Sequence, residues 1–157
     1  MKVLIISDTH GKLDNFKKVL NIEKSVDMIL HLGDVCHDEE EIRELANCDV
    51  RYVRGNCDIF SYESDSLDFK IGNYNFHMEH GHFLSTNLQS IAYKAEEIGA
   101  DVMLFGHTHI PLLTWVGDVR IINPGSLSRP RQSDGKPTYL VMNVDNNGEI
   151  EFFPKYL

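Results

Sequence analysis

The sequence predicts one mixed α/β domain over residues 1–157, and three observations carry this prediction. Short apolar runs alternate with amphipathic helical segments in the first half of the chain, a pattern typical of parallel strands joined by helices. The second half contains several strand pairs separated by turn residues. A chain of 157 residues with 42% hydrophobic content can bury a sizeable core without disulfides to stabilise it.

Three buried strands are expected in the first half, over residues 3–6, 28–32 and 51–53. Their apolar runs are typical of strands that are covered on both faces. A helix after the first strand is expected to bury an apolar face formed by Leu13, Phe16, Val19 and Leu20. A second helix is expected to start among the acidic residues 38–41 and to present Ile42 and Leu45 to the core.

The second half is expected to be mostly antiparallel. Residues 67–71 and 74–78 flank Gly72-Asn73, which is a hairpin signal. A helix over about 86–98 is expected to end at Gly99, and a buried strand over 102–105 follows it. The remaining strands are expected at residues 112–116, 119–122, 139–144 and 150–153.

Charge and cysteine content exclude several classes of protein. The formal net charge of -9 argues against a dedicated nucleic-acid binder and against a polybasic membrane-binding surface. Three cysteines with no CxxC pair argue against a disulfide framework and favour a reducing compartment. No apolar run reaches the roughly 20 residues of a membrane span, and the run after Lys2 is too short for a signal peptide. We therefore expect a cytoplasmic protein without membrane association.

Metal-ligating residue types follow five of the predicted strands, at the point where each strand ends. In chain order these donors are Asp8, His10, Asp34, Asn56, His80, His107 and His109. Because the carboxyl ends of strands in an open α/β sheet converge on one crevice, we expect the seven side chains to meet there. Imidazole, carboxylate and amide donors suit Mn²⁺, Zn²⁺ and Fe²⁺, and seven are enough for two ions if one carboxylate bridges them. The alternative is a set of surface turns rich in Asp and His.

These residues form motifs that are similar to the signature of the calcineurin-like metallophosphoesterases. The motifs are Asp8-x-His10, Gly33-Asp34, Gly55-Asn56-Cys57-Asp58, His80-Gly81-His82 and Gly106-His107-Thr108-His109. The chain length and the segment 123–126 resemble the small YfcE-like phosphodiesterase branch, and the resemblance extends from Met1 to about Arg131. It implies a two-sheet mixed β-sandwich flanked by helices, an αββα arrangement that refines the mixed α/β prediction.

The resemblance also implies a dinuclear metal centre. By that resemblance the first ion is held by Asp8, His10 and His109, and the second by Asn56, His80 and His107, with Asp34 bridging both. A hydroxide shared by the two ions would attack phosphorus in line. We expect Mn²⁺, while Zn²⁺, Ni²⁺, Co²⁺ and Fe²⁺ also suit these ligands. Asp34, Asn56 and His80 are the predicted catalytic residues.

Cys57 departs from the family pattern, in which a histidine at this position donates a proton or contacts phosphate. A thiol is a weak hydrogen-bond donor, so we expect a preference for phosphodiesters with acidic leaving groups such as aryl esters. The alternative is that Cys57 is only a small residue beside the site. Nearby, Asp58 is expected to orient Asn56 or a backbone amide, and the alternative is a simple turn carboxylate. His82 is expected to act as an outer partner of the ligands, or else to have no part in the chemistry. Arg129 is expected to contact the substrate, and the alternative is a solvated arginine.

Five other side chains carry expectations outside the metal centre. His31 lies within a predicted strand and is expected to be a hydrogen-bonded core residue, whereas His77 is expected at the surface. Trp115, Phe152 and Phe153 are expected to pack within strands. If these aromatic residues were exposed, they would indicate a contact between subunits in a homo-oligomer.

The leading function is metal-dependent hydrolysis of a small phosphodiester. Because the chain is strongly acidic, a short diester or cyclic nucleotide is expected rather than DNA or RNA. Two alternatives remain: a protein-interaction scaffold resembling a eukaryotic retromer subunit, and a phosphomonoesterase. A metallo-β-lactamase-type hydrolase is excluded because the chain lacks an HxHxDH run.

Overall fold

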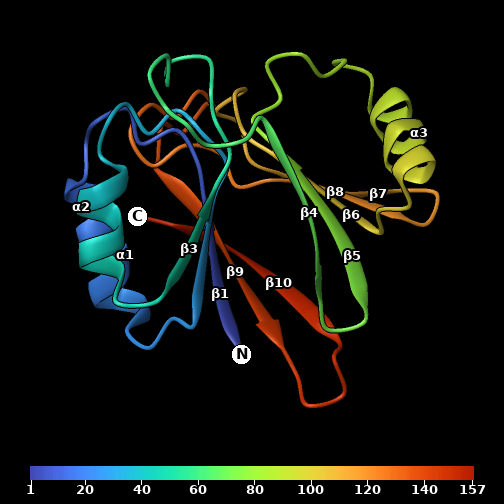
Figure 1. The fold of residues 1–157 in the computed structure, drawn as a ribbon, viewed down its shortest axis with the longest axis horizontal. Coiled ribbons are helices and arrows are strands. Elements are labelled where there is room, and N and C mark those ends of the chain that lie inside the picture. The colour runs from blue at the N-terminus through green and yellow to red at the C-terminus, as the bar shows by residue number, and fades with distance from the viewer.

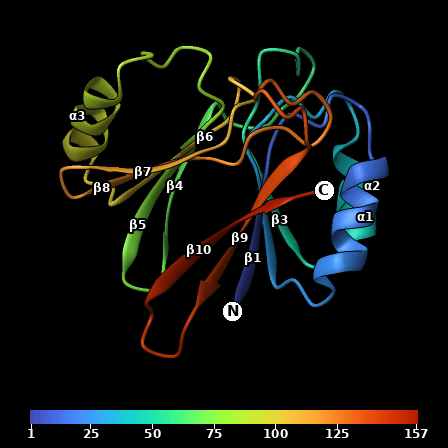
Figure 2. The ribbon, with the colours of Figure 1, turned by 180° about the vertical axis from the view of Figure 1, so that it is seen from behind.

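The computed structural model describes all 157 residues and places ten strands and three helices in four layers. Two five-stranded sheets pack face to face, and the helices cover their outer faces (Figure 1). Viewed from behind, α1 and α2 lie beyond one sheet and α3 lies beyond the other (Figure 2). The αββα arrangement implied by the motifs is therefore confirmed.

The first sheet has the strand order β10-β9-β1-β2-β3. Its strands are β1 (Lys2–Ile6), β2 (Met28–His31), β3 (Asp49–Tyr52), β9 (Thr138–Val144) and β10 (Ile150–Tyr156). Strands β1, β2 and β3 run parallel, and β9 pairs antiparallel with both β1 and β10. The helices α1 (Asp14–Glu23) and α2 (Glu39–Ala46) cover its outer face. Because the helices bury one face of β1 and the second sheet buries the other, its sequence is a continuous apolar run.

The second sheet has the order β4-β5-β6-β8-β7. Its strands are β4 (Ser66–Ile71), β5 (Tyr74–Glu79), β6 (Val102–Phe105), β7 (Leu112–Val116) and β8 (Val119–Asn123). The two hairpins β4–β5 and β7–β8 are antiparallel as predicted. With the β9–β10 hairpin, these pairings make the second half mostly antiparallel as expected, but β5, β6 and β8 run parallel, which was not predicted. The helix α3 (Leu88–Ile98) carries the chain back across the sheet, and β6 therefore starts at the same end as β5.

The sheets and helices enclose three apolar layers. Between the two sheets, side chains such as Ile5, Leu30, Phe76 and Leu104 form the central core. A second layer joins the first sheet to α1 and α2, and a third joins the second sheet to α3. These layers hold the carboxyl ends of the parallel strands of both sheets at the edge drawn uppermost in Figure 1.

Several local expectations differ from the structure. Strand β10 continues beyond Phe153 through Pro154, which an edge strand tolerates because one side of it forms no ladder hydrogen bonds. Leu45 is 37% exposed because it lies to one side of the buried face of α2 that Ile42 marks. Trp115 is 55% exposed and Phe153 is 38% exposed, so the expectation of strand packing is wrong for both. Self-association through these aromatic side chains stays a prediction.

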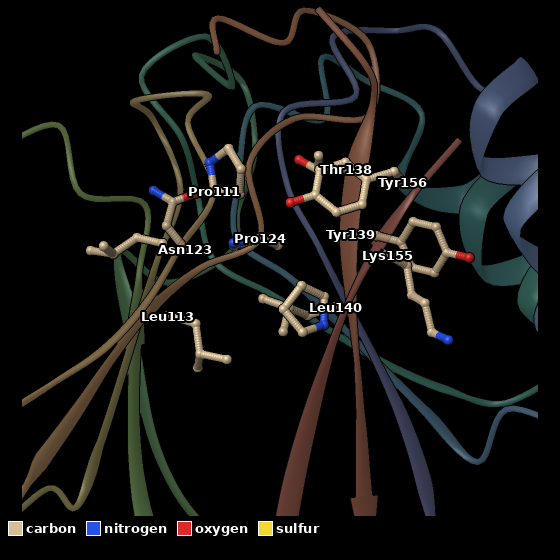
Figure 3. A pocket seen from close by; sticks show the side chains of 11 residues that line it. Pro111, Leu113, Asn123, Pro124, Thr138, Tyr139, Leu140, Lys155 and Tyr156 are labelled. Atoms are coloured by element: carbon tan, nitrogen blue, oxygen red, sulfur yellow. The ribbon is translucent and has the colours of Figure 1, made fainter. Parts of the chain in front are cut away.

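A small cavity of about 110 Å³ lies between the open edges of the two sheets (Figure 3). Pro111, Leu113 and Asn123 line one side, and Thr138 and Leu140 line the other. None of the seven predicted donors lines this cavity, so it is separate from the candidate site. No helix of the protein is long and apolar enough to cross a membrane.

Candidate metal centre

The seven predicted donors lie on loops that follow the parallel strands of both sheets. Asp8 and His10 follow β1, Asp34 follows β2, and Asn56 comes after β3. In the second sheet, His80 directly follows β5 and the pair His107 and His109 follows β6. The candidate centre therefore spans the line along which the two sheets meet, as the convergence of strand ends predicts.

One cluster consists of Asp8, His10, Asp34 and His109, whose donor atoms all lie within 4.8 Å of one another. His109 Nε2 lies 3.0 Å from Asp8 Oδ1 and 3.3 Å from His10 Nε2. Asp8 Oδ1 is buried and has no hydrogen-bond partner. A buried carboxylate oxygen without a partner is costly unless a cation neutralises it. This orphaned oxygen, together with its mixed oxygen and nitrogen neighbours, fits a divalent ion.

A second cluster lies beside the first. His80 Nε2 is 3.2 Å from Asn56 Oδ1 and 3.5 Å from Asp34 Oδ1, and the His107 ring lies 5.2 Å from the His80 ring. The other carboxylate oxygen, Asp34 Oδ2, lies 3.6 Å from His10 Nε2. Asp34 thus contacts a histidine from each sheet, which is the place that a bridging carboxylate needs.

Backbone carbonyls orient two of the histidines. His80 Nδ1 donates to Leu32 O and His109 Nδ1 donates to Arg129 O, both at 2.7 Å. These bonds direct Nε2 of each ring into the centre, as in metal-ligating histidines. Burial lowers the pKa of His10 and of His107, which favours the neutral, metal-binding form of both rings.

Asp34 remains ionised despite its burial. Burial alone would raise its pKa, but the His80 imidazole and the Cys57 amide outweigh this effect and hold the pKa below its ordinary value. The Cys57 N–H donates to Asp34 Oδ1 at 2.8 Å. The carboxylate therefore carries the negative charge that two neighbouring cations would require.

The backbone at the centre adopts conformations that side chains rarely favour. Five of the seven donors have a positive φ between 46° and 62°: Asp8, His10, Asp34, His107 and His109. A non-glycine residue in this region costs on the order of 1–3 kcal/mol. Strain of this kind concentrates where side-chain placement serves function, which supports a functional role for these turns.

Two glycines let the strands approach closely enough to form the centre. A Cβ on Gly55 would collide with the Asp34 backbone nitrogen and carboxylate. On Gly106 it would collide with the Ser7 hydroxyl and lie 3.0 Å from Asp8 Oδ2. Glycine therefore precedes Asn56 and His107 for steric reasons as well as for turn formation.

The four residues predicted to lie around the metal ligands have different surroundings in the structure. Asp58 accepts hydrogen bonds from Gly55 N at 2.8 Å and Cys36 N at 2.7 Å, an arrangement that orients backbone amides. Cys57 is partly exposed, and burial together with the Asp34 carboxylate raises its pKa, so the thiol stays protonated. The His82 ring lies 5.6 Å from the His80 ring. Arg129 has an exposed side chain, and its carbonyl oxygen accepts the hydrogen bond from His109; contact of its guanidinium with a substrate stays a prediction.

The other histidine predictions had mixed outcomes. His31 is fully buried between Thr9 and Gly33 N, as predicted, and burial lowers its pKa to about 4. The prediction for His77 is wrong, because this residue is only 5% exposed and its Nδ1 lies 2.7 Å from Asp68 on the paired strand. That cross-strand partner is nine residues away and could not be read from the local pattern.

The sequence analysis gave no positioning role to several residues that hold the centre in place. The hydroxyls of Ser126 and Ser128 both donate to Asp8 O at 2.9 Å, and Asn123 Nδ2 donates to Gly106 O at 2.7 Å. Asn123 is the last residue of β8, and Ser126 and Ser128 lie in the loop that follows, so their place at a strand end was a signal like that of the donors. Cys36 was also missed; its sulfur lies 3.9 Å from His10 Nδ1.

The chain is similar to several known proteins. A family model described as "Calcineurin-like phosphoesterase superfamily domain" matches residues 1–147. "Probable metallophosphoesterase YsnB" of Bacillus subtilis is 35% identical, over 94% of this chain and 86% of that protein. "Phosphodiesterase YfcE" of Escherichia coli is 28% identical, over 94% and 89% of the two chains. The structure of Zn²⁺-complexed Vps29 from Entamoeba histolytica is 21% identical, covers 99% of both chains and has a TM-score of 0.79, which shows a shared fold.

Proposed function

This chain belongs to the calcineurin-like phosphoesterase superfamily, and from that premise we propose that it hydrolyses small phosphodiesters with two divalent metal ions. The first ion would be held by Asp8, His10 and His109, and the second by Asn56, His80 and His107. Asp34 would bridge them. The observation that carries this proposal is the position of Asp34 between His10 and His80, which follow strands of different sheets.

Two divalent ions in this centre would supply Lewis acidity and make water acidic enough to ionise near neutral pH. The chain's own groups do the remaining work. The carboxylates of Asp8 and Asp34 fix the centre, and the neutral amide of Asn56 leaves more positive charge beside the substrate phosphate. The carbonyls that orient His80 and His109 keep those rings from turning away.

The proposal is tested by assaying bis(p-nitrophenyl) phosphate and p-nitrophenyl phosphate with Mn²⁺, Zn²⁺, Ni²⁺, Co²⁺ and Mg²⁺. We expect metal-dependent turnover of the diester, strongest with Mn²⁺, that a chelator abolishes and added metal restores. Faster turnover of the monoester would instead favour a phosphomonoesterase. Metal binding without turnover of either substrate would favour the scaffold alternative.

An apolar cavity beside the centre supports the proposal that the substrate is a phosphate ester with an apolar or aromatic group. The cavity measures about 440 Å³, and His82 and His107 lie on its wall. The rest of its lining is largely apolar and includes Leu84, Leu88, Phe105, Ile110 and Leu112. Because a proposed ligand of the second ion borders this space, a substrate phosphate at the centre would place one of its ester groups there.

Replacing Leu88 by Asn is expected to lower kcat/KM for the diaryl substrate by roughly 5- to 30-fold, the effect of losing about 1–2 kcal/mol of apolar contact. Methyl p-nitrophenyl phosphate should lose less, because its methyl group buries little surface. Leu45→Asn on α2 is the matched control, since Leu45 is exposed and does not line the cavity. Equal losses for the two substrates would contradict an apolar subsite at this position.

Cys57 is expected to limit the enzyme to good leaving groups. Its thiol stays protonated and is a weak donor, so little proton transfer to a departing alkoxide can come from it. Replacing Cys57 by His should raise activity on alkyl esters or monoesters relative to aryl diesters, by on the order of 10-fold or more. The measured quantity is the ratio of the two kcat/KM values, and an unchanged ratio would remove Cys57 from the mechanism.

A further inference from the structure

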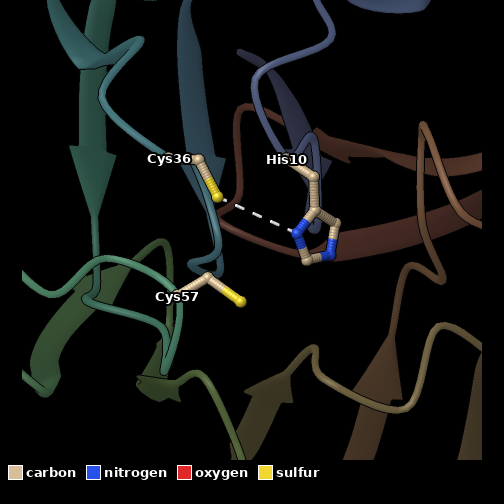
Figure 4. A group of neighbouring side chains, drawn as sticks. All are labelled: His10, Cys36 and Cys57. Atoms are coloured by element: carbon tan, nitrogen blue, oxygen red, sulfur yellow. Dashed lines mark hydrogen bonds between the residues drawn. The ribbon is translucent and has the colours of Figure 1, made fainter.

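A further group of donors consists of Cys36, Cys57 and His10 (Figure 4). It lies on the side of the His10 ring that faces away from the proposed metal centre. The two sulfurs and one His10 ring nitrogen lie within 4.8 Å of one another. Cys36 Sγ is 3.9 Å from His10 Nδ1, whereas His10 Nε2 faces the carboxylates of Asp8 and Asp34. Cys36 and Cys57 are partly exposed, whereas the His10 side chain is only 5% exposed, so an ion would approach from the cysteine side.

His10 differs from the two histidines that carbonyls orient. Nδ1 of His80 and Nδ1 of His109 each donate to a carbonyl oxygen at 2.7 Å. The contact of His10 Nδ1 is a sulfur at 3.9 Å, and sulfur is a weak hydrogen-bond acceptor. His10 Nδ1 is therefore held loosely and can supply a lone pair to an ion on the cysteine side.

We infer that Cys36, Cys57 and His10 Nδ1 form a binding site for one thiophilic divalent ion such as Zn²⁺ or Cd²⁺. Two thiolates and an imidazole are a donor set that these soft ions favour over Mn²⁺. Donor atoms of a tetrahedral site with bonds of about 2.0–2.3 Å lie roughly 3.3–3.8 Å apart, so small rotations of the side chains would close the site. Both thiols release their protons to solvent as the two metal–sulfur bonds form, and water completes the coordination.

Occupation of this site would exclude the first ion of the proposed centre. A neutral imidazole has one nitrogen lone pair. When His10 Nδ1 binds the soft ion, His10 Nε2 carries the proton and points it toward the carboxylates of Asp8 and Asp34. His10 then has no lone pair for an ion between those carboxylates. The soft ion and Mn²⁺ therefore compete through a single side chain, although their other ligands differ.

Titration of the reduced, metal-free protein with Cd²⁺ tests the site itself without any assay of catalysis. We expect thiolate-to-cadmium charge-transfer absorption that saturates at one equivalent per chain. The absorption should disappear in Cys36→Ser and in Cys57→Ser. It should persist in Cys48→Ser, the matched control, because Cys48 belongs to a different cluster of side chains. Absorption that survives in the Cys36→Ser/Cys57→Ser double variant would overturn the proposal.

The competition is tested by the free Mn²⁺ signal in electron paramagnetic resonance. In the wild type, Cd²⁺ should release bound Mn²⁺ at a concentration at least 10-fold lower than in the Cys36→Ser/Cys57→Ser double variant. Equal concentrations in the two proteins would contradict competition through His10. Because both readouts are spectroscopic, they keep their meaning if the protein fails to hydrolyse phosphodiesters.

Discussion

Replacing Asp34 by Asn is expected to leave the protein folded and to lower metal-dependent phosphodiesterase activity by on the order of 1,000-fold. The two side chains have nearly the same shape, and Asn can still accept the Cys57 N–H hydrogen bond through its carbonyl oxygen. However, it loses the negative charge beside both His10 and His80. Loss of a bridging charge removes several kcal/mol of stabilisation, and about 4 kcal/mol corresponds to 1,000-fold in rate.

The loss of metal affinity can be separated from a loss of folding by thermal denaturation. A ligand at 100 times its dissociation constant stabilises the native state by about 2.7 kcal/mol, so Mn²⁺ should raise the wild-type Tm by several degrees. The variant should melt cooperatively without this increase. Asp118→Asn, an exposed turn carboxylate, is the control that should behave like the wild type. A variant that kept full Mn²⁺ stabilisation and activity would contradict the bridging role of Asp34.

Replacing Gly55 by Ala is expected to cause the second-largest effect. The new Cβ would occupy the space of the Asp34 carboxylate and backbone nitrogen, so Asp34 or the loop after β3 must move. Overpacking of this kind costs about 1–3 kcal/mol of stability. Displacing a metal-bridging carboxylate by even 1 Å should lower activity by on the order of 100-fold. The measurements are the Tm and kcat/KM for the diaryl substrate.

Gly135→Ala separates steric collision from a general cost of replacing glycine. Gly135 lies in an exposed turn, has a φ of 62°, and would place its Cβ in open space. This control should lose about 1 kcal/mol through backbone strain and keep its activity. If Gly55→Ala lost no more activity than Gly135→Ala, the close approach at Gly55 would have no functional importance.

Much of the candidate centre follows from sequence because of one topological rule. Parallel strands present their carboxyl ends at a common edge, so donors that are far apart in sequence, such as Asp8 and His109, meet without any local signal linking them. The rule needs only the strands and their ends, which the apolar runs and the following glycines indicate. It succeeded for His107 and His109 even though the parallel direction of β6 was not predicted.

The remaining features depend on tertiary contacts that a one-dimensional pattern does not contain. The direction of β6 is set by how α3 packs across the sheet, and the burial of His77 depends on Asp68 from the paired strand. Cys36 sits at a φ of 61°, in a turn held by Asp58, and only this turn brings its sulfur to His10. Trp115 lines a shallow pocket together with residues of β10 from the other sheet, and it stays 55% exposed because β7 and β10 are both edge strands.

Elemental analysis after equilibrium dialysis against Mn²⁺ tests the proposed dinuclear centre most directly. The wild-type protein should retain close to two manganese ions per chain, and Asp34→Asn should retain fewer than one under the same conditions. A wild-type chain that retained no manganese, or that bound no more than Asp34→Asn, would contradict the proposed centre.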